Sequence, residues 1–241
     1  MQSTPSFGSF MSTRWTLVLR ANASSPEGKA ALSDLCEAYY QPVFVFLRRI
    51  GFDADTARDH AHSFFTHLLQ RGFPGPDPDR GRFRSYLLGA VKHFLANRRR
   101  DAAREKRGGG AEHVAFGEGT DTSPGVDVTD ATALPPDSTF DRAWALATVE
   151  RALVLLEGES EEAGQTAHFT TLKPWLTPAA SPASQADTAA QLGLSEGAVK
   201  VAIHRLRRRF REIVRAEVAQ TLHDPAELDD EMRHLVDALA D

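Results

Sequence analysis

Cysteine is almost absent from the chain, because Cys36 is the only one among 241 residues. A single cysteine excludes disulfide bonds and thiolate zinc sites within one chain, and its place in an apolar helical pattern predicts a core residue. No run approaches the roughly 18 consecutive apolar residues that a membrane span needs. Residues 1–10 lack the basic and apolar blocks of a signal peptide. The sequence therefore predicts a cytoplasmic protein without membrane insertion.

Motifs of the common enzyme classes are also missing. The chain has no glycine-rich phosphate loop and no serine or cysteine nucleophile motif. Asp55, Asp59 and His62 would share one face of a helix through i, i+4 and i+3 spacing, and three such groups can hold a divalent metal. No fourth ligand is visible, so a metal-dependent enzyme stays a third hypothesis. We expect no catalytic residues, no metal and no cofactor.

Charge is unevenly distributed along the chain. The net charge of −5 disfavours a nucleic-acid partner when taken alone. However, residues 80–107 hold ten Lys/Arg against two acids, and residues 200–211 hold six Lys/Arg and no acid. Each basic block precedes an acidic one, since residues 108–141 hold seven acids and no Lys or Arg, and residues 223–241 hold seven acids against one Arg. This layout predicts two polyanion-binding surfaces in a chain kept soluble by its acidic segments.

Residues 108–139 interrupt the helical patterns. They contain six glycines and three prolines with almost no apolar periodicity, so they cannot bury enough surface to offset their ordering entropy. We interpret them as a flexible acidic linker. Neither side of it shows the alternation typical of strands. The prediction is an all-α fold with two small helical domains, residues 12–107 and 140–222, the second a helix-turn-helix domain, followed by an acidic helix within residues 223–241.

Helical spacing with caps and breaks divides the first domain. The predicted helices are residues 14–20 after a cap at Ser12 or Thr13, a helix opening at Ser25-Pro26, residues 43–50 restarted by Pro42 and ended by Gly51, residues 53–72 capped by Asp53, and residues 81–100.

The last of these helices combines an apolar stripe with a basic exterior. Arg98, Arg99 and Arg100 are candidate phosphate ligands. Tyr86 lies at the edge of the stripe, where either packing or stacking on an unpaired base is open. Phe83 and Phe94 fall on the stripe and are interpreted as packing.

Residues 189–210 carry the most informative pattern, AAQLGLSEGAVKVAIHRLRRRF. A short helix ends at Gly193 and Ser195 caps a second helix, which is the layout of a helix-turn-helix. Apolar residues of the second helix recur at intervals of 4, 3 and 4, which leaves a basic outer face of the kind that a DNA major groove accepts. The candidate DNA-binding residues are Ser195, Glu196, Lys200, His204, Arg205, Arg207, Arg208 and Arg211.

Together these segments resemble the sigma-70-type bacterial RNA polymerase sigma factors, specifically the small extracytoplasmic-function group. Residues 189–210 are similar to the promoter-reading motif of that family's second domain. GRFRSYLLGAVKHFLANRRR (81–100) looks like the stretch of its first domain that melts and reads the downstream promoter element. The resemblance extends from about residue 13 to residue 215. It implies an all-helical fold, binding to core RNA polymerase and to promoter DNA, and it leaves room for an anti-sigma or other regulatory protein.

The resemblance also implies where the polymerase binds. In this family the docking helix usually carries Asp-Leu followed by a Gln-Glu-like pair, whereas this chain has DHAHS at residues 59–63. The implied polymerase-binding residues are Asp55, Asp59, His62 and Ser63. The alternative function is a free-standing helix-turn-helix transcriptional regulator. We favour the sigma factor because a regulator has no need of a second basic helix in a separate domain.

Residues 223–241 predict one more helix. Asp224 and Pro225 form a cap and first-turn pair, and apolar residues recur at helical intervals through this acidic segment. Two interpretations are open. The helix packs against the preceding domain as a structural cap, or its acids lie near residues 200–211 and compete with DNA.

Overall fold

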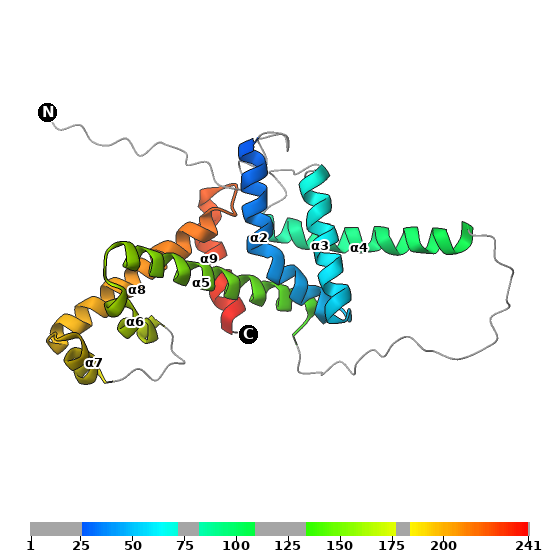
Figure 1. Ribbon diagram of the computed structural model, residues 1–241. Coiled ribbons are helices and arrows are strands. Elements are labelled where there is room, and N and C mark those ends of the chain that lie inside the picture. The colour runs from blue at the N-terminus through cyan, green and yellow to red at the C-terminus, as the bar shows by residue number, and fades with distance from the viewer. Residues whose placement is uncertain (1–25, 72–81, 109–133, 177–183, 241) are drawn as a thin grey trace, which may run out of the picture.

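The computed structural model describes residues 26–71, 82–108, 134–176 and 184–240, and every regular element in these ranges is helical (Figure 1). The all-α prediction is confirmed for this part of the chain. The predicted helix at residues 14–20 and most of the predicted linker lie outside it. The elements are α2 (Pro26–Arg49), α3 (Ala54–Arg71), α4 (Phe83–Gly108), α5 (Pro136–Glu162), α6 (Thr166–Leu172), η2 (Lys173–Leu176), α7 (Gln185–Leu192), α8 (Glu196–Ala219), η3 (Pro225–Glu227) and α9 (Leu228–Ala240).

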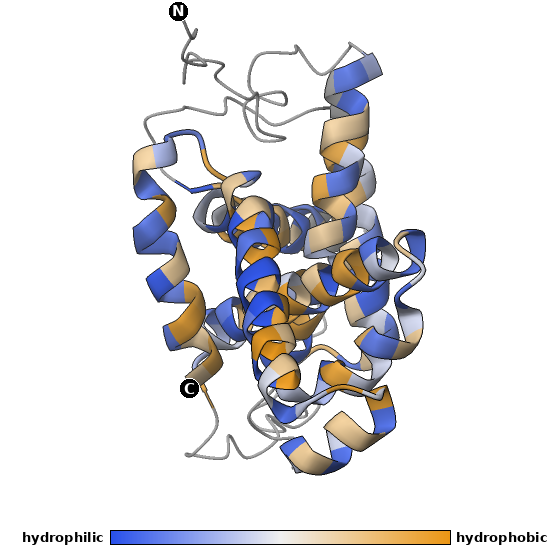
Figure 2. Ribbon diagram, turned by 90° about the vertical axis from the view of Figure 1, so that its left-hand side faces the viewer, coloured by the Kyte–Doolittle hydropathy of each residue, from blue (hydrophilic) through white to orange (hydrophobic). Residues whose placement is uncertain are grey.

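The central helix is α5, which packs against α2, α8 and α9. From this centre α4 extends to one end of the molecule, and α6 and α7 lie at the opposite end (Figure 1). Hydrophobic and hydrophilic residues are interspersed along most helices (Figure 2). No helix in the described ranges is long and apolar enough to cross a membrane.

Helix α2 is continuous across Pro42, so the prediction that the chain restarts there is wrong. Proline inside a helix removes one N–H and leaves the carbonyl four residues earlier without its helical donor. Here that carbonyl belongs to Ala38, and Arg151 of α5 donates to it from Nη1 at 3.2 Å. A donor from a neighbouring helix thus replaces the missing amide, which no local pattern in α2 could reveal.

The beginning of α3 follows the sequence prediction. Gly51 adopts a φ of 103°, a conformation that favours glycine, and separates α2 from α3. Asp53 Oδ1 then accepts hydrogen bonds from the backbone amides of Asp55 and Thr56 at 3.0 and 2.9 Å. These bonds, with the Thr56 amide first, lower the pKa of Asp53. The cap predicted at Asp53 is confirmed.

Two predicted boundaries are wrong. Helix α4 runs to Gly108, beyond the predicted end at Arg100. Helix α5 begins at Pro136, so residues 136–139 are helical and do not belong to a linker. Pro136 occupies the first position of α5, where a proline costs no helical hydrogen bond. Leu134, just before α5, accepts a hydrogen bond from Arg49 Nε at 2.7 Å.

A single hydrophobic core joins the two predicted domains. Its buried residues come from α2, α3, α4, α5, α6, α8 and α9. Tyr39 of α2 and Phe83 of α4 meet with ring centroids 4.9 Å apart. Phe46 of α2 meets Phe140 of α5 at 6.4 Å. A smaller cluster comprises Leu172, Ala189, Val199 and Ile203. The packing therefore does not separate residues 26–108 from residues 134–222.

The C-terminal helix forms as predicted. Asp224 Oδ1 accepts from the Ala226 amide at 2.8 Å, and the 3-10 turn η3 leads into α9. Leu235 is buried in the core, where α9 packs against α5 and α8. Within the described ranges, the ion pairs of η3 and α9 reach Arg82, Arg84 and Arg215, and none reaches residues 200–211. His234 Nε2 of α9 also lies 3.3 Å from Asp141. These contacts correspond to the structural-cap interpretation.

Candidate nucleic-acid interface

The geometry between α7 and α8 is set by two local signals. Gly193 adopts a φ of 65° and ends α7, with its amide bonded back to the last turn. Ser195 Oγ accepts a hydrogen bond from the Ala198 amide at 3.2 Å and caps α8. Val199 and Ile203 are buried on the inner face of α8. A short helix, a three-residue connection and a long helix are therefore fixed with the outer face of α8 turned away from the core.

The outer face of α8 is exposed and basic over its first half. All eight candidate residues on this helix are exposed: Ser195, Glu196, Lys200, His204, Arg205, Arg207, Arg208 and Arg211. Within the described part of the chain, Lys200, Arg205 and Arg211 form no ion pair with an acid. These three cations are exposed on one helix without a paired acid in these ranges, so a bound polyanion would lower the electrostatic energy of this surface.

Other cations of α8 are already engaged. Arg209 binds both carboxylate oxygens of Glu159 on α5, from Nη2 at 2.6 Å and from Nε at 2.9 Å. Arg207 Nε donates to the carbonyl of Trp175 at 3.0 Å, and Arg208 lies 3.6 Å from Glu212. The hydrogen bonds that Arg209 donates to Glu159, followed by the one to Glu212, raise the pKa of Arg209. The cations at residues 200–211 are therefore not equally available to bind a polyanion.

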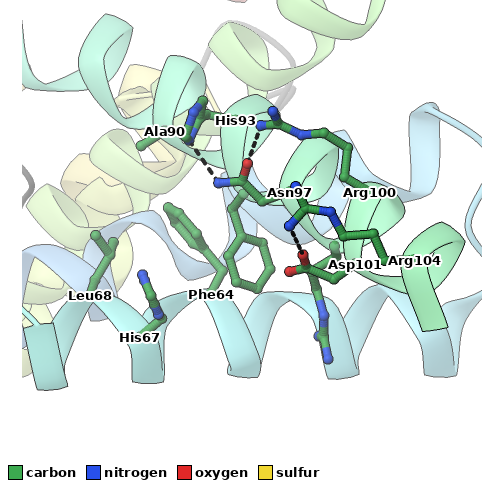
Figure 3. A pocket seen from close by; sticks show the side chains of 11 residues that line it. Phe64, His67, Leu68, Ala90, His93, Asn97, Arg100, Asp101 and Arg104 are labelled. Atoms are coloured by element: carbon green, nitrogen blue, oxygen red, sulfur yellow. Dashed lines mark hydrogen bonds and ion pairs between the residues drawn. The ribbon is translucent and has the colours of Figure 1, made fainter. Parts of the chain in front are cut away.

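A second basic surface surrounds a hollow of about 520 Å³ between α3 and α4 (Figure 3). Phe64, His67 and Leu68 line it from α3. From α4 come Ala90, His93, Phe94, Asn97, Arg98, Arg100, Asp101 and Arg104. Arg98, Arg99 and Arg100 are all exposed. The sequence predicted these cations but not the hollow, because α3 residues complete it.

The three aromatic residues predicted on α4 have different surroundings, and Phe83 is buried in the core as predicted. Tyr86 is half-buried against the core, burial raises its pKa, and it does not line the hollow. Phe94 does line it, and the Arg98 guanidinium lies 5.6 Å from the centre of its ring. Next to it, the Asn97 amide nitrogen lies 3.2 Å from His93 Nδ1, and Arg100 donates to the Asn97 oxygen (Figure 3). The hollow is therefore lined by the ring of Phe94, by the polar side chains of His93 and Asn97, and by guanidinium groups.

The predicted polymerase-binding residues lie on α3. Asp55, Asp59 and His62 are exposed, and Ser63 is half-buried. Asp55 accepts from Arg58 Nη1 at 2.7 Å. His62 Nε2 lies 3.2 Å from the Tyr40 hydroxyl of α2. In the described ranges, no three His, Cys, Asp or Glu side chains converge as metal ligands. His62 and Ser63 also border a second hollow, of about 460 Å³, with Arg98.

His60 of α3 lies close enough to the arginines of α4 for their charges to affect its pKa. Partial burial, followed by the charges of Arg98 and Arg99, lowers its pKa, although Asp59 opposes this shift. Its ring contacts Phe52 edge-on at 4.6 Å. No pattern in the sequence indicates this role of His60, because its proximity to the arginines of α4 depends on how the two helices pack.

Comparison of the chain with models of protein families, with curated proteins and with solved structures found no match in any of the three.

Proposed function

We propose that this chain is an RNA polymerase sigma factor of the extracytoplasmic-function type, which binds core polymerase and directs it to promoter DNA in the cytoplasm. The observation that carries the proposal is the exposed outer face of α8, where Lys200, Arg205 and Arg211 have no acidic partner in the described ranges. The short helix α7, the bend at Gly193 and the cap at Ser195 support a helix-turn-helix assignment.

The hollow between α3 and α4 supports a second contact with nucleic acid. Arg98, Arg99 and Arg100 can bind phosphates, and a base released from the duplex can stack on an aromatic ring. Both Phe94 and Tyr86 are half-buried against the core, but only Phe94 borders the hollow, so we assign the unpaired base to Phe94. The exposed face of α3 around Asp59 and His62 remains for polymerase docking.

The separation of the two basic surfaces fits this assignment. Helix α7 and the beginning of α8 lie at one end of the molecule, and the far end of α4 lies at the other (Figure 1). A protein that contacts two promoter boxes needs two such surfaces, whereas a regulator that reads one site needs one. In the proposal, residues 109–133 connect a promoter-melting half to a promoter-reading half.

The test combines two measurements on the full chain. We expect co-elution with core RNA polymerase and promoter-dependent transcription. A variant carrying Arg205→Gln and Arg211→Gln should still co-elute with the polymerase but lose promoter binding. The Arg209→Gln variant should lose much less promoter binding, because Arg209 is already paired with Glu159. DNA binding by the free chain without co-elution would instead support the free-standing regulator. Absence of both would refute each of these functions.

A further inference from the structure

The beginning of α4 carries an unfavourable concentration of positive charge. A helix N-terminus already has a partial positive charge from its unpaired amides, and acidic residues normally occupy its first turn. The first turn of α4 contains no acid; instead Arg84 lies in it and Arg82 immediately precedes it. Arg84 is 7% exposed. This charge needs anions from elsewhere in the molecule.

The missing anion comes from the C-terminal helix. Glu231 of α9 is 0% exposed. Its Oε1 accepts from Arg84 Nε at 3.1 Å, and its Oε2 lies 2.7 Å from Arg82 Nη1. Asp141 of α5 accepts from Arg84 Nη1 at 2.5 Å, and the guanidinium lies 5.1 Å from the centre of the Trp144 ring. One buried carboxylate therefore holds two arginines that flank the first residue of α4.

We propose that Glu231 is a positioning residue for the nucleic-acid surface of α4, because it holds the beginning of that helix against α9, while Asp141 holds Arg84 against α5. Helix α4 continues from this contact to Phe94 and Arg98, so its placement sets the geometry of the hollow. The acidic C-terminal helix then supports the basic surface of α4, and its ion pairs in the described ranges do not reach the basic face of α8 at residues 200–211. The proposal rests on the function proposed above only for its effect on DNA.

The experiment compares two neutralised carboxylates of α9 in the full chain. Glu231→Gln keeps the shape of the side chain and removes its charge. Asp229→Asn is the matched control, since Asp229 is exposed and pairs with Arg215 at 2.8 Å. Hydrogen exchange of the backbone amides of residues 86–91 should accelerate at least tenfold in Glu231→Gln, with the amides of α8 and all amides of Asp229→Asn unchanged. Glu231→Asp, which keeps the charge, should recover part of the protection.

A second readout concerns DNA opening. With core polymerase present, permanganate reactivity of promoter thymines should fall several-fold for Glu231→Gln and stay at the wild-type level for Asp229→Asn. Unchanged exchange in α4, or equal acceleration in every helix, would overturn the positioning role. If the wild-type chain opens no promoter, the proposed function fails, while the exchange experiment still decides the role of Glu231.

Discussion

Replacing Arg151 tests how helix α2 tolerates Pro42 in its interior. Arg151 Nη1 donates to the Ala38 carbonyl, which Pro42 leaves without a helical donor, and its Nε lies 3.4 Å from Glu217. Arg151→Met keeps most of the apolar stem but removes these donors and a third, Nη2, which donates to Thr148 Oγ1 at 3.4 Å. Leaving a buried carbonyl unsatisfied costs about 1–3 kcal/mol. For a domain of this size, each 1 kcal/mol lowers the melting temperature by about 2–4 °C.

A double-mutant cycle isolates that carbonyl. In Pro42→Ala, the amide of residue 42 can bond to the Ala38 carbonyl, so Arg151→Met should cost about 1–2 kcal/mol less there than in the wild-type chain. Urea unfolding followed by tryptophan fluorescence measures all four proteins. If Arg151→Met costs the same in both backgrounds, the guanidinium does not compensate for the proline, and the interaction with Glu217 explains its effect.

Three further predictions concern the candidate interface. Arg205→Gln should reduce the salt dependence of DNA binding by about 0.9 in the slope of log K against log salt, whereas Arg209→Gln should change it less; equal reductions would contradict the pairing of Arg209. Ser195→Ala should destabilise α8 by about 1 kcal/mol in urea unfolding and Ser195→Asp should not, because only alanine lacks a capping acceptor. The pKa of His60 is lower in the folded protein than its ordinary value of 6.5, so His60 of the unfolded chain is protonated first as the pH falls. The free energy of unfolding should therefore decline on acidification. His60→Gln should flatten this decline, and Arg98→Gln should raise the pKa of His60 in an NMR titration; an unmoved pKa would exclude the arginine as a cause.

Local sequence signals predicted local structure well. The caps at Asp53, Ser195 and Asp224 act through residues two or three positions away, so their geometry follows from short-range chemistry. Gly193 ends α7 for the same reason. The apolar intervals on α8 likewise predicted that Val199 and Ile203 face inward.

The errors arise where a partner distant in the sequence decides the outcome. Pro42 predicted a break because proline has no amide hydrogen for the Ala38 carbonyl. The prediction failed because Arg151, 113 residues away, supplies that donor. The composition of residues 108–139 predicted a linker but contains no information on whether the flanking helices pack together. The hollow beside Phe94 was missed because two helices build it. Spacing within one helix cannot report such contacts.

Deletion of residues 223–241 distinguishes the two interpretations of the acidic C-terminal helix. The acids follow the basic residues 200–211 of α8 in sequence, yet Glu231 is buried against Arg84 of α4 and Arg82, which precedes that helix. Removing α9 leaves the buried Arg84 with Asp141 alone, and breaking a buried pair costs about 3–5 kcal/mol. We therefore expect a large fall in melting temperature and no gain in DNA affinity at α8. Tighter DNA binding with little change in melting temperature would instead identify α9 as an inhibitor of α8.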